Sequence, residues 1–433
     1  MSARKIAALV WFLALTPGLV VLIFMGPADF DSAGAVLNTA GRLTGILGLS
    51  MLLVAAALCC RVPGFDRPFG GLTKLWQLHH RIGAAAFLLL LAHPVFLSLA
   101  AADVSLSTSV ATLFSNTPGL WLGWLALLSM MVFLAPSFAF FGLPGYQRWK
   151  WLHRLSGPAI VLALIHTLLL ARTLPGIWNW ILWTVFLAIA LVALGYRWLF
   201  SRVWGRHRYL IDEVHTPANN VVELVLKPLG EPLDYVAGQF VYLTPYDKNL
   251  EAGYREEHPY TLSSAPGESG LRIAIKDLGN ASRALQSVTP GTEVNIEGPY
   301  GDFFPRTEDG RPELWIAGGI GITPFLGRLR HLAREGLPAD LHLVFCVQDE
   351  SRALFLEELK TLVDRIEGAS LSLHFFYREG PLSADFLHRH CPDLTQRHAY
   401  ICGPVPLLHL ARKLLIQAGV PQHCILTEEF VLL

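Results

Sequence analysis

The chain has 433 residues, of which 53% are hydrophobic and only 16% are charged, whereas an average soluble domain carries roughly 25% charged residues. Residues 1–205 hold 13 basic and 4 acidic side chains, and residues 206–433 hold the other 21 basic and 30 acidic ones. The excess positive charge therefore falls among apolar segments, which indicates membrane orientation. This distribution disfavours a wholly soluble protein and a polybasic nucleic-acid-binding protein.

Six apolar segments in the first half are each long enough to cross a bilayer, whose core of about 30 Å needs roughly 20 residues of helix. The first segment follows Arg4 and Lys5 and is too long for the core of a signal peptide, so we expect a retained membrane span. The six segments are 6–25, 43–60, 76–100, 119–141, 151–171 and 177–200.

Basic residues mark alternate connections between these segments. The positive-inside rule then places both ends of the chain in the cytoplasm, as expected for a multi-pass protein of the cell (inner) membrane. The basic residues concerned are Arg4 and Lys5, then Arg61, Arg67 and Lys74, then Arg148 and Lys150, and finally Arg197, Arg202, Arg206 and Arg208.

Two histidines lie deep within apolar segments, and each has a partner towards the cytoplasmic end of its segment. An ionisable side chain inside the membrane is costly to bury unpaired, so it indicates a functional site. His79 precedes His93 by 14 residues and His153 precedes His166 by 13, which in a helix correspond to about 21 and 20 Å. Two such helices side by side would present two facing imidazole pairs, the arrangement that holds two haems. Two matched pairs disfavour the alternative that each histidine only packs.

Helical geometry favours some of these candidate ligands more than others. Fourteen residues return to nearly the same face of a helix, which favours His79 over its neighbour His80. Thirteen residues fall about 140° short of four turns, so His153 and His166 match less well. Pro158 lies between them and could bend the helix enough to redirect one side chain. With two imidazoles on each iron no coordination position stays open, so we expect the haems to pass single electrons.

From about Arg206 the sequence changes to alternating polar and apolar stretches separated by proline and glycine. Such alternation, seen in 209–214 and 220–226, is typical of a small antiparallel barrel. After about Arg311, short apolar runs alternate with helix-length segments, as in a parallel sheet of βα units. These runs are 314–317, 341–345, 371–376 and 399–402.

A glycine-rich turn joins the first of these runs to a helical segment. Gly318, Gly319 and Gly321 permit close approach of the backbone, and the N-terminus of the next helix offers free N–H groups to a pyrophosphate. The turn reads Gly-x-Gly-x-x-Pro, so the ordinary Rossmann fingerprint is not met. Cys402 and Gly403 follow at the carboxyl edge of the predicted sheet, where ligands of open α/β sheets bind.

A second group of polar residues follows the barrel-like stretch. Residues 258–264, His-Pro-Tyr-Thr-Leu-Ser-Ser, combine an imidazole, an aromatic ring and hydroxyl groups. Such groups can stack an isoalloxazine ring and bond its edge and phosphate. Ser282 precedes a helical segment, where an N-cap hydroxyl can meet another phosphate. Each motif alone fits an ordinary turn, but their order along the chain favours a bound flavin.

Together, the membrane histidines and the soluble motifs resemble the ferric reductase and NADPH oxidase family of transmembrane haem flavoproteins over nearly the whole chain. The resemblance implies a membrane all-α six-helix bundle with haem in residues 1–205. It also implies a cytosolic module similar to ferredoxin–NADP reductase, with an FAD-binding β-barrel in 206–310 and an NAD(P)H-binding α/β domain in 311–433. The implied cofactors are FAD and two b-type haems, and the implied donor is NADPH, with NADH as the alternative.

The resemblance implies a role for each residue that matches a family motif. The inner haem would be held by His79 and His153, and the outer haem by His93 and His166. The flavin-binding residues would be His258, Pro259, Tyr260, Thr261 and Ser263, with Ser282 at a flavin phosphate. The nicotinamide nucleotide would bind Gly319, Gly321, Thr323 and Pro324, with Cys402 and Gly403 beside the nicotinamide.

Two further residues match less closely. Arg378 follows a strand expected to end at Tyr377, where members that prefer NADPH place a basic residue for the 2′-phosphate, and a guanidinium suits that group. Phe430 would cover the flavin ring until the nicotinamide displaces it. In some relatives this aromatic residue is the last one, whereas here three residues follow it.

The resemblance implies electron transfer from NADPH to an acceptor across the membrane, either dioxygen, giving superoxide, or a ferric complex. The predicted outer loops, 27–42, 101–118 and 172–177, contain no evident domain for a bulky ferric complex, which favours dioxygen. Arg42 and Arg172 lie there, and three roles stay open for them: interface anchors, partners of haem propionates, or groups that attract an anionic product. A donor subunit for a partner protein would use the same carriers, whereas a six-span channel would lack haem. Neither an accessory subunit nor an EF-hand calcium site is evident from the sequence.

Overall fold

The computed structural model describes residues 3–137, 146–170, 176–196, 205–304 and 310–428. The chain divides into two compact units, one comprising residues 1–61 and 74–200 and the other comprising residues 62–73 and 201–433. The second unit thus includes Val62–Thr73, a segment that the sequence places between two membrane spans. The division of the soluble part at residue 310 stays a prediction.

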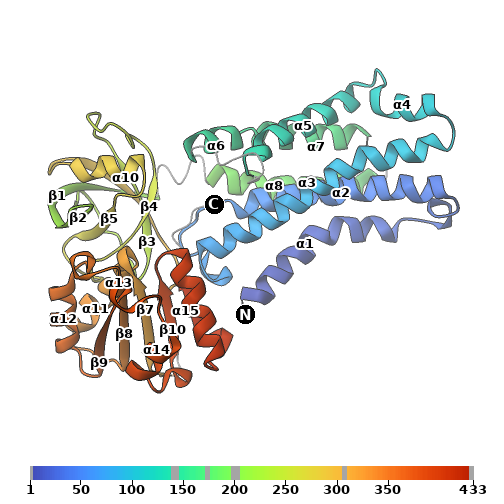
Figure 1. Cartoon of the computed structure of the whole chain (residues 1–433). Helices are drawn as coiled ribbons and strands as arrows, with labels where there is room; N and C mark the ends of the chain where they lie inside the picture. The colour runs from blue at the N-terminus through green and yellow to red at the C-terminus, as the bar shows by residue number, and fades with distance from the viewer. Residues whose placement is uncertain (1–2, 138–145, 171–175, 197–204, 305–309, 429–433) are drawn as a thin grey trace. The chain divides into compact units, whose positions relative to one another are not determined.

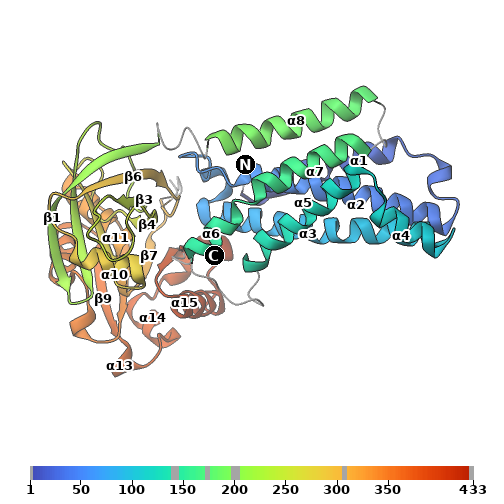
Figure 2. The ribbon, with the colours of Figure 1, turned by 90° about the horizontal axis from the view of Figure 1, so that it is seen from above.

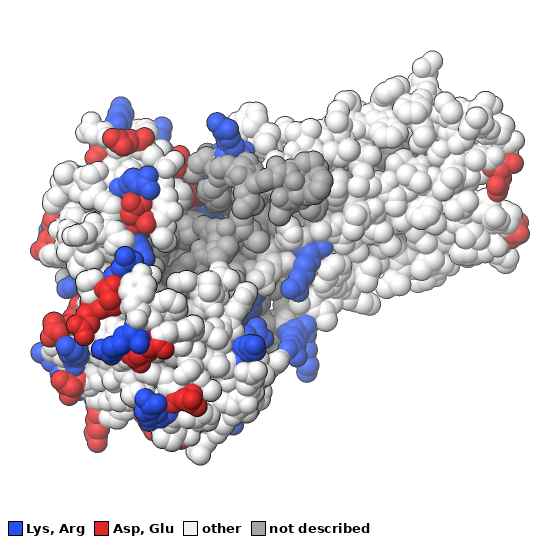
Figure 3. Space-filling view, viewed as in Figure 1, with Lys and Arg blue, Asp and Glu red and all other residues white. Residues whose placement is uncertain are grey.

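The predicted six-span membrane region is confirmed, because six helices among the described residues are long and apolar enough to cross a bilayer. On the face seen in Figure 3, the helical unit bears few charged side chains along its length, whereas the second unit carries many of both signs. The spans are α1 (Ala3–Ile23), α2 (Ala33–Leu58), α3 (Leu72–Ala102), α5 (Pro118–Leu134) with the turn after it, α6 (Tyr146–His153) with α7 (Ser156–Leu170), and α8 (Gly176–Gly195).

Two of the predicted outer loops contain helix. α2 begins at Ala33, inside the predicted loop 27–42, because the Ser32 hydroxyl accepts a hydrogen bond from the N–H of Ala35 at 3.1 Å. The additional helix α4 (Leu106–Phe114) begins after Ser105, which caps it in the same way (Figure 1). Polar serine caps therefore start helices where the sequence predicted only connections.

Helices α2, α3, α5 and α7 run side by side in both ribbon views (Figures 1 and 2). Glycines on α2 allow its close approach to α3. A Cβ added at Gly41 would lie 2.6 Å from a methyl carbon of Leu97, and one at Gly48 would lie 2.5 Å from Cγ of Leu90. Small residues at such contacts let the backbones of membrane helices approach one another.

The predicted antiparallel barrel is present as a curled six-stranded sheet with the order β4-β3-β6-β1-β2-β5. Leu262, just beyond β4, forms a bridge to Ile273 on β5, so the two ends of the sheet meet. The interior is lined by alternate apolar side chains of these strands. The strands are β1 (Arg206–Ala218), β2 (Val221–Pro228), β3 (Phe240–Pro245), β4 (His258–Thr261), β5 (Leu271–Lys276) and β6 (Glu293–Tyr300), and the short helix α10 (Asn280–Ala284) follows β5.

The predicted α/β domain contains a five-stranded parallel sheet with the order β11-β10-β7-β8-β9. One face of the sheet packs on α11 and α12, and the other packs on α14 and α15. The strands are β7 (Glu313–Gly318), β8 (Leu341–Val347), β9 (Ala369–Phe375), β10 (His398–Cys402) and β11 (Ile425–Glu428), the last of which the sequence analysis did not predict. The helices are α11 (Thr323–Glu335), α12 (Leu356–Arg365), α13 (Phe376–Glu379), α14 (Ala384–His390) and α15 (Val405–Gln417).

His342 on β8 makes the stability of this domain depend on pH. Burial lowers the pKa of its imidazole to about 4, from an ordinary value of about 6.5. Between pH 6.5 and pH 4 the unfolded chain therefore binds a proton at His342, whereas the folded chain does not. The resulting stability is complete above about pH 6.5 and is lost as the pH falls through this window.

We therefore expect His342→Gln to reduce the loss of thermal stability between about pH 7 and pH 5, by about 1 kcal/mol at pH 5. Glutamine can still bond the Ser370 hydroxyl, which lies 2.6 Å from Nδ1 of His342, but it does not titrate. The measurement is the Tm of the full chain at both pH values, with the exposed His409 on α15 replaced by glutamine as the control. The same pH dependence in all three proteins would contradict this assignment.

Candidate functional site

The four predicted membrane histidines lie in two facing pairs. In the pair His79 and His153, and in the pair His93 and His166, the ring centroids are 6.2 Å apart. A metal–nitrogen bond of about 2 Å and about 1.1 Å from nitrogen to ring centre, counted on both sides, give about 6 Å. The separation therefore fits one metal ion between the two rings of each pair, as in a haem iron with two imidazole ligands.

Backbone carbonyl groups orient three of these four imidazoles. A carbonyl oxygen only accepts, so Nδ1 of each ring carries the proton and Nε2 keeps the lone pair that binds a metal. The hydrogen bonds run from His79 to the carbonyl of Ala55 at 2.7 Å, from His93 to that of Gly41 at 2.7 Å, and from His166 to that of Gly119 at 2.8 Å.

Two glycines leave room for the rings of His93 and His166. A Cβ added at Gly45 on α2 would lie 2.7 Å from Nδ1 of His93, and one added at Gly123 on α5 would lie 2.6 Å from Nδ1 of His166. Each glycine stands one turn after the glycine whose carbonyl binds the same ring. A larger side chain at either position would displace the imidazole. α2 and α5 therefore contact His93 and His166 in the same way, each through a glycine.

A cavity of about 450 Å³ lies beside His93 and His166 within the helical unit. Its walls are largely apolar, and its size falls in the range of about 300–1,000 Å³ found for cofactor and small-molecule sites. Arg42 lines it, but its guanidinium bonds the carboxylate of Asp29 and the hydroxyl of Thr39. The positive charge of Arg42, for which a haem propionate was one expected partner, is thus already balanced by Asp29. Arg172 lies outside the described residues.

The span that carries His153 and His166 is interrupted near Pro158, as the sequence suggested. α6 ends at His153 and α7 begins at Ser156, which places Pro158 in the first turn of α7, where its missing N–H is tolerated. The interruption explains how a spacing of 13 residues lets both rings face their partners on α3. His80 is exposed, whereas its neighbour His79 faces His153, so the geometry favours His79.

The predicted flavin-binding segment forms β4 and the residues after it. Thr261 is buried, and its hydroxyl has no hydrogen-bond partner among the described residues. Such an unsatisfied buried group fits a site that is completed by a cofactor. Burial raises the pKa of the Tyr260 hydroxyl, and the ring stays partly accessible for stacking. Nε2 of His258 lies 3.3 Å from a carboxylate oxygen of Glu256.

Ser263 and Ser282 use their hydroxyl groups within the protein. Ser263 is fully buried and donates to Glu223 at 3.0 Å. Ser282 was expected as an N-cap, but α10 starts at Asn280 with Gly279 as its cap, which is a correction. The Ser282 hydroxyl instead accepts hydrogen bonds from the N–H groups of Leu278 and Gly279, both at 2.9 Å. The flavin contacts of both serines stay predictions.

The two predicted nucleotide motifs meet at adjacent strand ends. The chain turns at Gly319–Ile322 after β7, and a Cβ added at Gly321 would lie 2.4 Å from the carbonyl oxygen of Cys402 at the end of β10. A Cβ added at Gly403 would lie 3.0 Å from the Cα and N atoms of Gly318. Strands β8 and β9 extend the sheet on one side of β7, and β10 and β11 extend it on the other. The motifs therefore lie at the topological switch point, where α/β sheets bind nucleotides.

The first turn of α11 contains Thr323 and Pro324, as the resemblance implied for the nucleotide site. The hydroxyl of Thr323 donates to the carbonyl of Ile320 at 3.1 Å and so fixes the turn. Cys402 is fully buried, and burial raises the pKa of its thiol well above the usual value, with the carboxylate of Glu428 adding to the effect. The thiol stays protonated at neutral pH, and because Cys402 is fully buried, its contact with the nicotinamide stays a prediction.

Arg378 lies on the short helix α13, because β9 ends at Phe375 and not at Tyr377 as predicted. Its guanidinium stacks 4.6 Å from the ring centre of Phe375 and bonds Glu379 at 3.0 Å. The side chain is 65% exposed and follows a strand of the nucleotide sheet, so it is available to a phosphate.

If Arg378 binds the 2′-phosphate, Arg378→Ala should raise the KM for NADPH by about tenfold and leave the KM for NADH unchanged. The measurement is steady-state oxidation of each nucleotide by the purified chain. Arg389→Ala, which removes an exposed arginine from α14, is the charge-matched control. Equal changes in both KM values would contradict the assignment.

Sequence reasoning missed two buried residues that hold the end of the flavin barrel. Asp66 accepts a hydrogen bond from the N–H of Gly301 at 2.9 Å, and Gln239 donates to the carbonyl of Gly301 at 3.1 Å. Both side chains are buried, and burial raises the pKa of the Asp66 carboxyl. One available signal was that Asp66 is among only four acidic residues in the first 205. Phe430 lies outside the described residues.

Three family models match the chain in sequence. The "Ferric reductase like transmembrane component" matches residues 44–164, the "FAD-binding domain" matches residues 207–303, and the "Oxidoreductase NAD-binding domain" matches residues 315–413. Together with the six apolar helices and the two sheets, these matches define a membrane-embedded flavin-dependent NAD(P)H oxidoreductase. This set of three matches is that of the ferric reductase and NADPH oxidase-like family.

Curated relatives match about half of the chain. A flavohemoprotein of Bordetella pertussis is 29% identical over 220 residues, which is 46% of this chain and 54% of that protein. The ferredoxin–NAD(+) reductase component of an alkene monooxygenase system from Xanthobacter autotrophicus is 28% identical, over 52% of this chain and 70% of that protein. The chain thus spans about half the length of the flavohemoproteins that it matches.

Two solved structures cover different shares of the chain. The flavohem-like FAD/NAD-binding domain of nitric oxide dioxygenase from Vibrio cholerae is 25% identical, covers 51% of this chain and 97% of that one, and has a TM-score of 0.45. A flavohemoglobin from Malassezia yamatoensis, with bound FAD and haem, is 20% identical, covers 81% and 87% of the two chains, and has a TM-score of 0.49.

Proposed function

We propose that this chain transfers electrons from NADPH on the cytoplasmic side, through FAD and two haems, to dioxygen on the opposite side of the membrane, producing superoxide. NAD(P)H-driven electron transfer through a membrane-embedded region is the function of its domain set. The donor preference, the two haems, the acceptor and the orientation are the proposed parts. The observation that carries the proposal is the equal separation of 6.2 Å in both histidine pairs.

The nucleotide would bind at the switch point between β7 and β10. The free N–H groups at the start of α11 would contact its pyrophosphate, and the space beside Gly319, where an added Cβ would meet no atom within 4 Å, would leave room for it. Arg378 would select the 2′-phosphate of NADPH. These groups bind and orient the donor, and none of them takes part in proton transfer.

The β4 segment would bind FAD, with Tyr260 against the ring and the free hydroxyl of Thr261 bonded to its edge. FAD supplies two-electron chemistry towards NADPH and one-electron chemistry towards haem, and haem with two imidazoles supplies one-electron transfer. His79 and His153 would hold the inner haem, and His93 and His166 the outer one. If each haem is held by two imidazoles, no ligand position on its iron would stay open, and the acceptor would be reduced at the edge of the site formed by His93 and His166.

Superoxide dismutase distinguishes the proposed product from the alternatives. We expect NADPH-driven reduction of cytochrome c by the purified, FAD-supplied chain in vesicles to fall by most of its rate when the dismutase is added. A rate that the dismutase does not change would contradict superoxide as the main product. If the same preparation then reduces a ferric chelate faster than it consumes dioxygen, the chain is a ferric-chelate reductase. If it reduces neither acceptor although NADPH reduces its flavin, an electron-accepting partner is required.

A further inference from the structure

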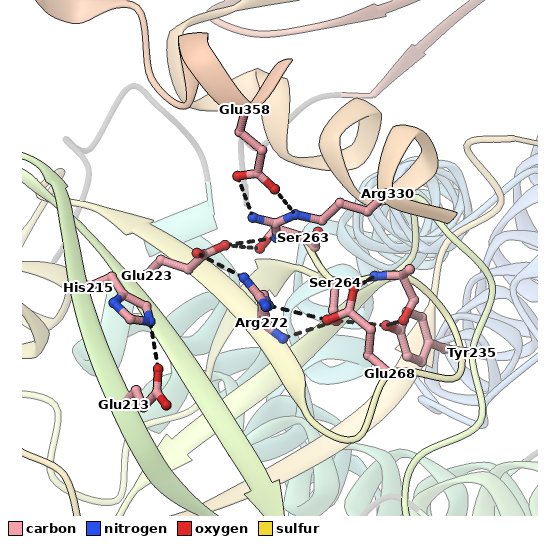
Figure 4. A network of polar contacts seen from close by, with 11 residues as sticks. Glu213, His215, Glu223, Tyr235, Ser263, Ser264, Glu268, Arg272, Arg330 and Glu358 are labelled. Carbon is pink, nitrogen blue, oxygen red and sulfur yellow. Dashed lines mark hydrogen bonds and ion pairs between the residues drawn. The ribbon is translucent and has the colours of Figure 1, made fainter. Parts of the chain in front are cut away.

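A buried arginine joins the two sheets of the second unit. Arg330 on α11 is 7% exposed and bonds both carboxylate oxygens of Glu358 on α12, at 2.7 and 2.9 Å. Its remaining nitrogen, Nη1, crosses to the flavin barrel, where it donates to Glu223 at 3.0 Å and to the backbone carbonyl of Ser263 at 2.8 Å (Figure 4). One guanidinium therefore holds three separate elements.

Glu223 forms the barrel side of this network. The carboxylate on β2 is 4% exposed and also accepts the hydroxyl proton of Ser263 at 3.0 Å. Arg272 on β5 lies 4.0 Å from its other oxygen and bonds Glu268 at 3.2 Å (Figure 4). A buried carboxylate needs such compensation, and loss of Arg330 would leave Glu223 with only the Ser263 hydroxyl and the more distant Arg272.

The helix also contacts the barrel without a side chain between them. Gly327 precedes Arg330 by three residues, so both lie on one face of α11. A Cβ added at Gly327 would lie 2.9 Å from the carbonyl oxygen of Leu262 and 3.1 Å from that of Ser264. Residues 262–264 are thus held by the helix at three successive positions, by backbone contact at the first and last and by a hydrogen bond at the middle one.

The two elements joined here are those that would carry the two reactants. Residues 262–264 directly follow Tyr260 and Thr261 of the flavin segment. α11 begins at Thr323 of the nucleotide turn, and Gly327 and Arg330 lie about 6 and 10 Å further along the helix. Few flexible bonds separate the contact from either site, so its geometry sets how the nicotinamide and the flavin ring approach.

We propose that Arg330, with Glu223 and Gly327, is a positioning element that fixes the separation of nicotinamide and flavin for hydride transfer. This inference rests on the proposed NADPH-to-flavin step. In that step a hydride, which carries two electrons, leaves C4 of the nicotinamide and reduces FAD, and NADP⁺ is the oxidised product. Arg330 contacts neither reactant and acts through the helix and the strand. Hydride transfer requires reacting atoms held at close range, and a displacement of about 1 Å can lower the rate about 100-fold.

The test is anaerobic stopped-flow reduction of the FAD in the full-length chain by saturating NADPH. We expect Arg330→Gln and Gly327→Ala each to lower the rate constant of flavin reduction by about tenfold or more, with unchanged FAD content and haem absorbance. The long-wavelength charge-transfer absorbance formed with NADP⁺ should weaken in both variants. Arg334→Gln, on the same helix but exposed and paired only with Glu335 at 3.8 Å, is the matched control and should stay within about twofold of wild type.

Each outcome decides the inference separately from the proposed function. A wild-type flavin that NADPH does not reduce refutes the function itself. Wild-type rates in the two variants overturn the positioning role. If Arg330→Gln loses FAD, the rate constant of flavin reduction in Gly327→Ala, a variant that alters no charge, decides whether the contact positions the two reactants. Loss of FAD from both variants also overturns the proposal, because the contact then serves folding and not the geometry of transfer.

Discussion

Replacing His93 with alanine should leave about one haem iron per chain where the wild type holds about two. The ring faces His166 at 6.2 Å, beside a cavity of about 450 Å³, and donates its Nδ1 proton to Gly41, so its Nε2 is the ligand that is lost. The expected readout is iron per chain together with the reduced-minus-oxidised spectrum. His153→Ala should remove the other haem and leave the His93 pair intact.

Two designs sharpen this expectation. His80→Ala is the matched control for His79→Ala, because the two residues are adjacent on α3 but only His79 faces His153; the control should keep both haems. Pairing across helices also predicts that a His93/His166 double variant keeps one haem, whereas a His79/His93 double variant keeps none. Two haems in the His93→Ala protein, or equal loss in both double variants, would contradict the assigned pairs.

Gly321→Ala should lower the rate of NADPH oxidation by at least about tenfold while leaving the haem content unchanged. The added methyl group would lie 2.4 Å from the backbone oxygen of Cys402, and backbone cannot move aside without opening the contact between β7 and β10. The proposed pyrophosphate site is built on that contact. The measurement is flavin reduction by NADPH, with dithionite reduction of the haems as the check on the membrane unit.

The control for this variant is Gly230→Ala, in the exposed turn after β2, where an added Cβ meets no atom within 4 Å. We expect its NADPH oxidation to match the wild type. Normal activity in the Gly321→Ala protein would show that the turn does not need the close approach, and the nucleotide site would then have to be placed elsewhere on the sheet.

Periodic features of the sequence predicted the architecture well. Apolar length gave the six spans, alternation gave the barrel, and short apolar runs gave four of the five parallel strands. The histidine spacing also led to the facing pairs, because helical geometry converts 14 residues directly into a vertical separation. That geometry fitted His153 and His166 less well, and the helix is interrupted at residues 154–155, shortly before Pro158.

Contacts between distant segments were not predictable from local pattern. Nothing around Arg330 or Glu223 distinguishes them from solvated charges, since their burial depends on how two sheets meet. Asp66 lies 235 residues before its partner Gly301. The strand end at Phe375 and the cap of α10 were misplaced by two or three residues, because boundaries depend on individual hydrogen bonds such as those to the Ser282 hydroxyl.

The most direct test of the account is the absorbance of the purified full-length chain, expressed with ample iron and porphyrin precursor and supplied with FAD. We predict a Soret band equivalent to about two haems per chain, with spectra typical of two axial imidazoles, and reduction of these haems when NADPH is added without oxygen. A chain that folds and binds FAD but shows no Soret absorbance would contradict the proposed electron path across the membrane.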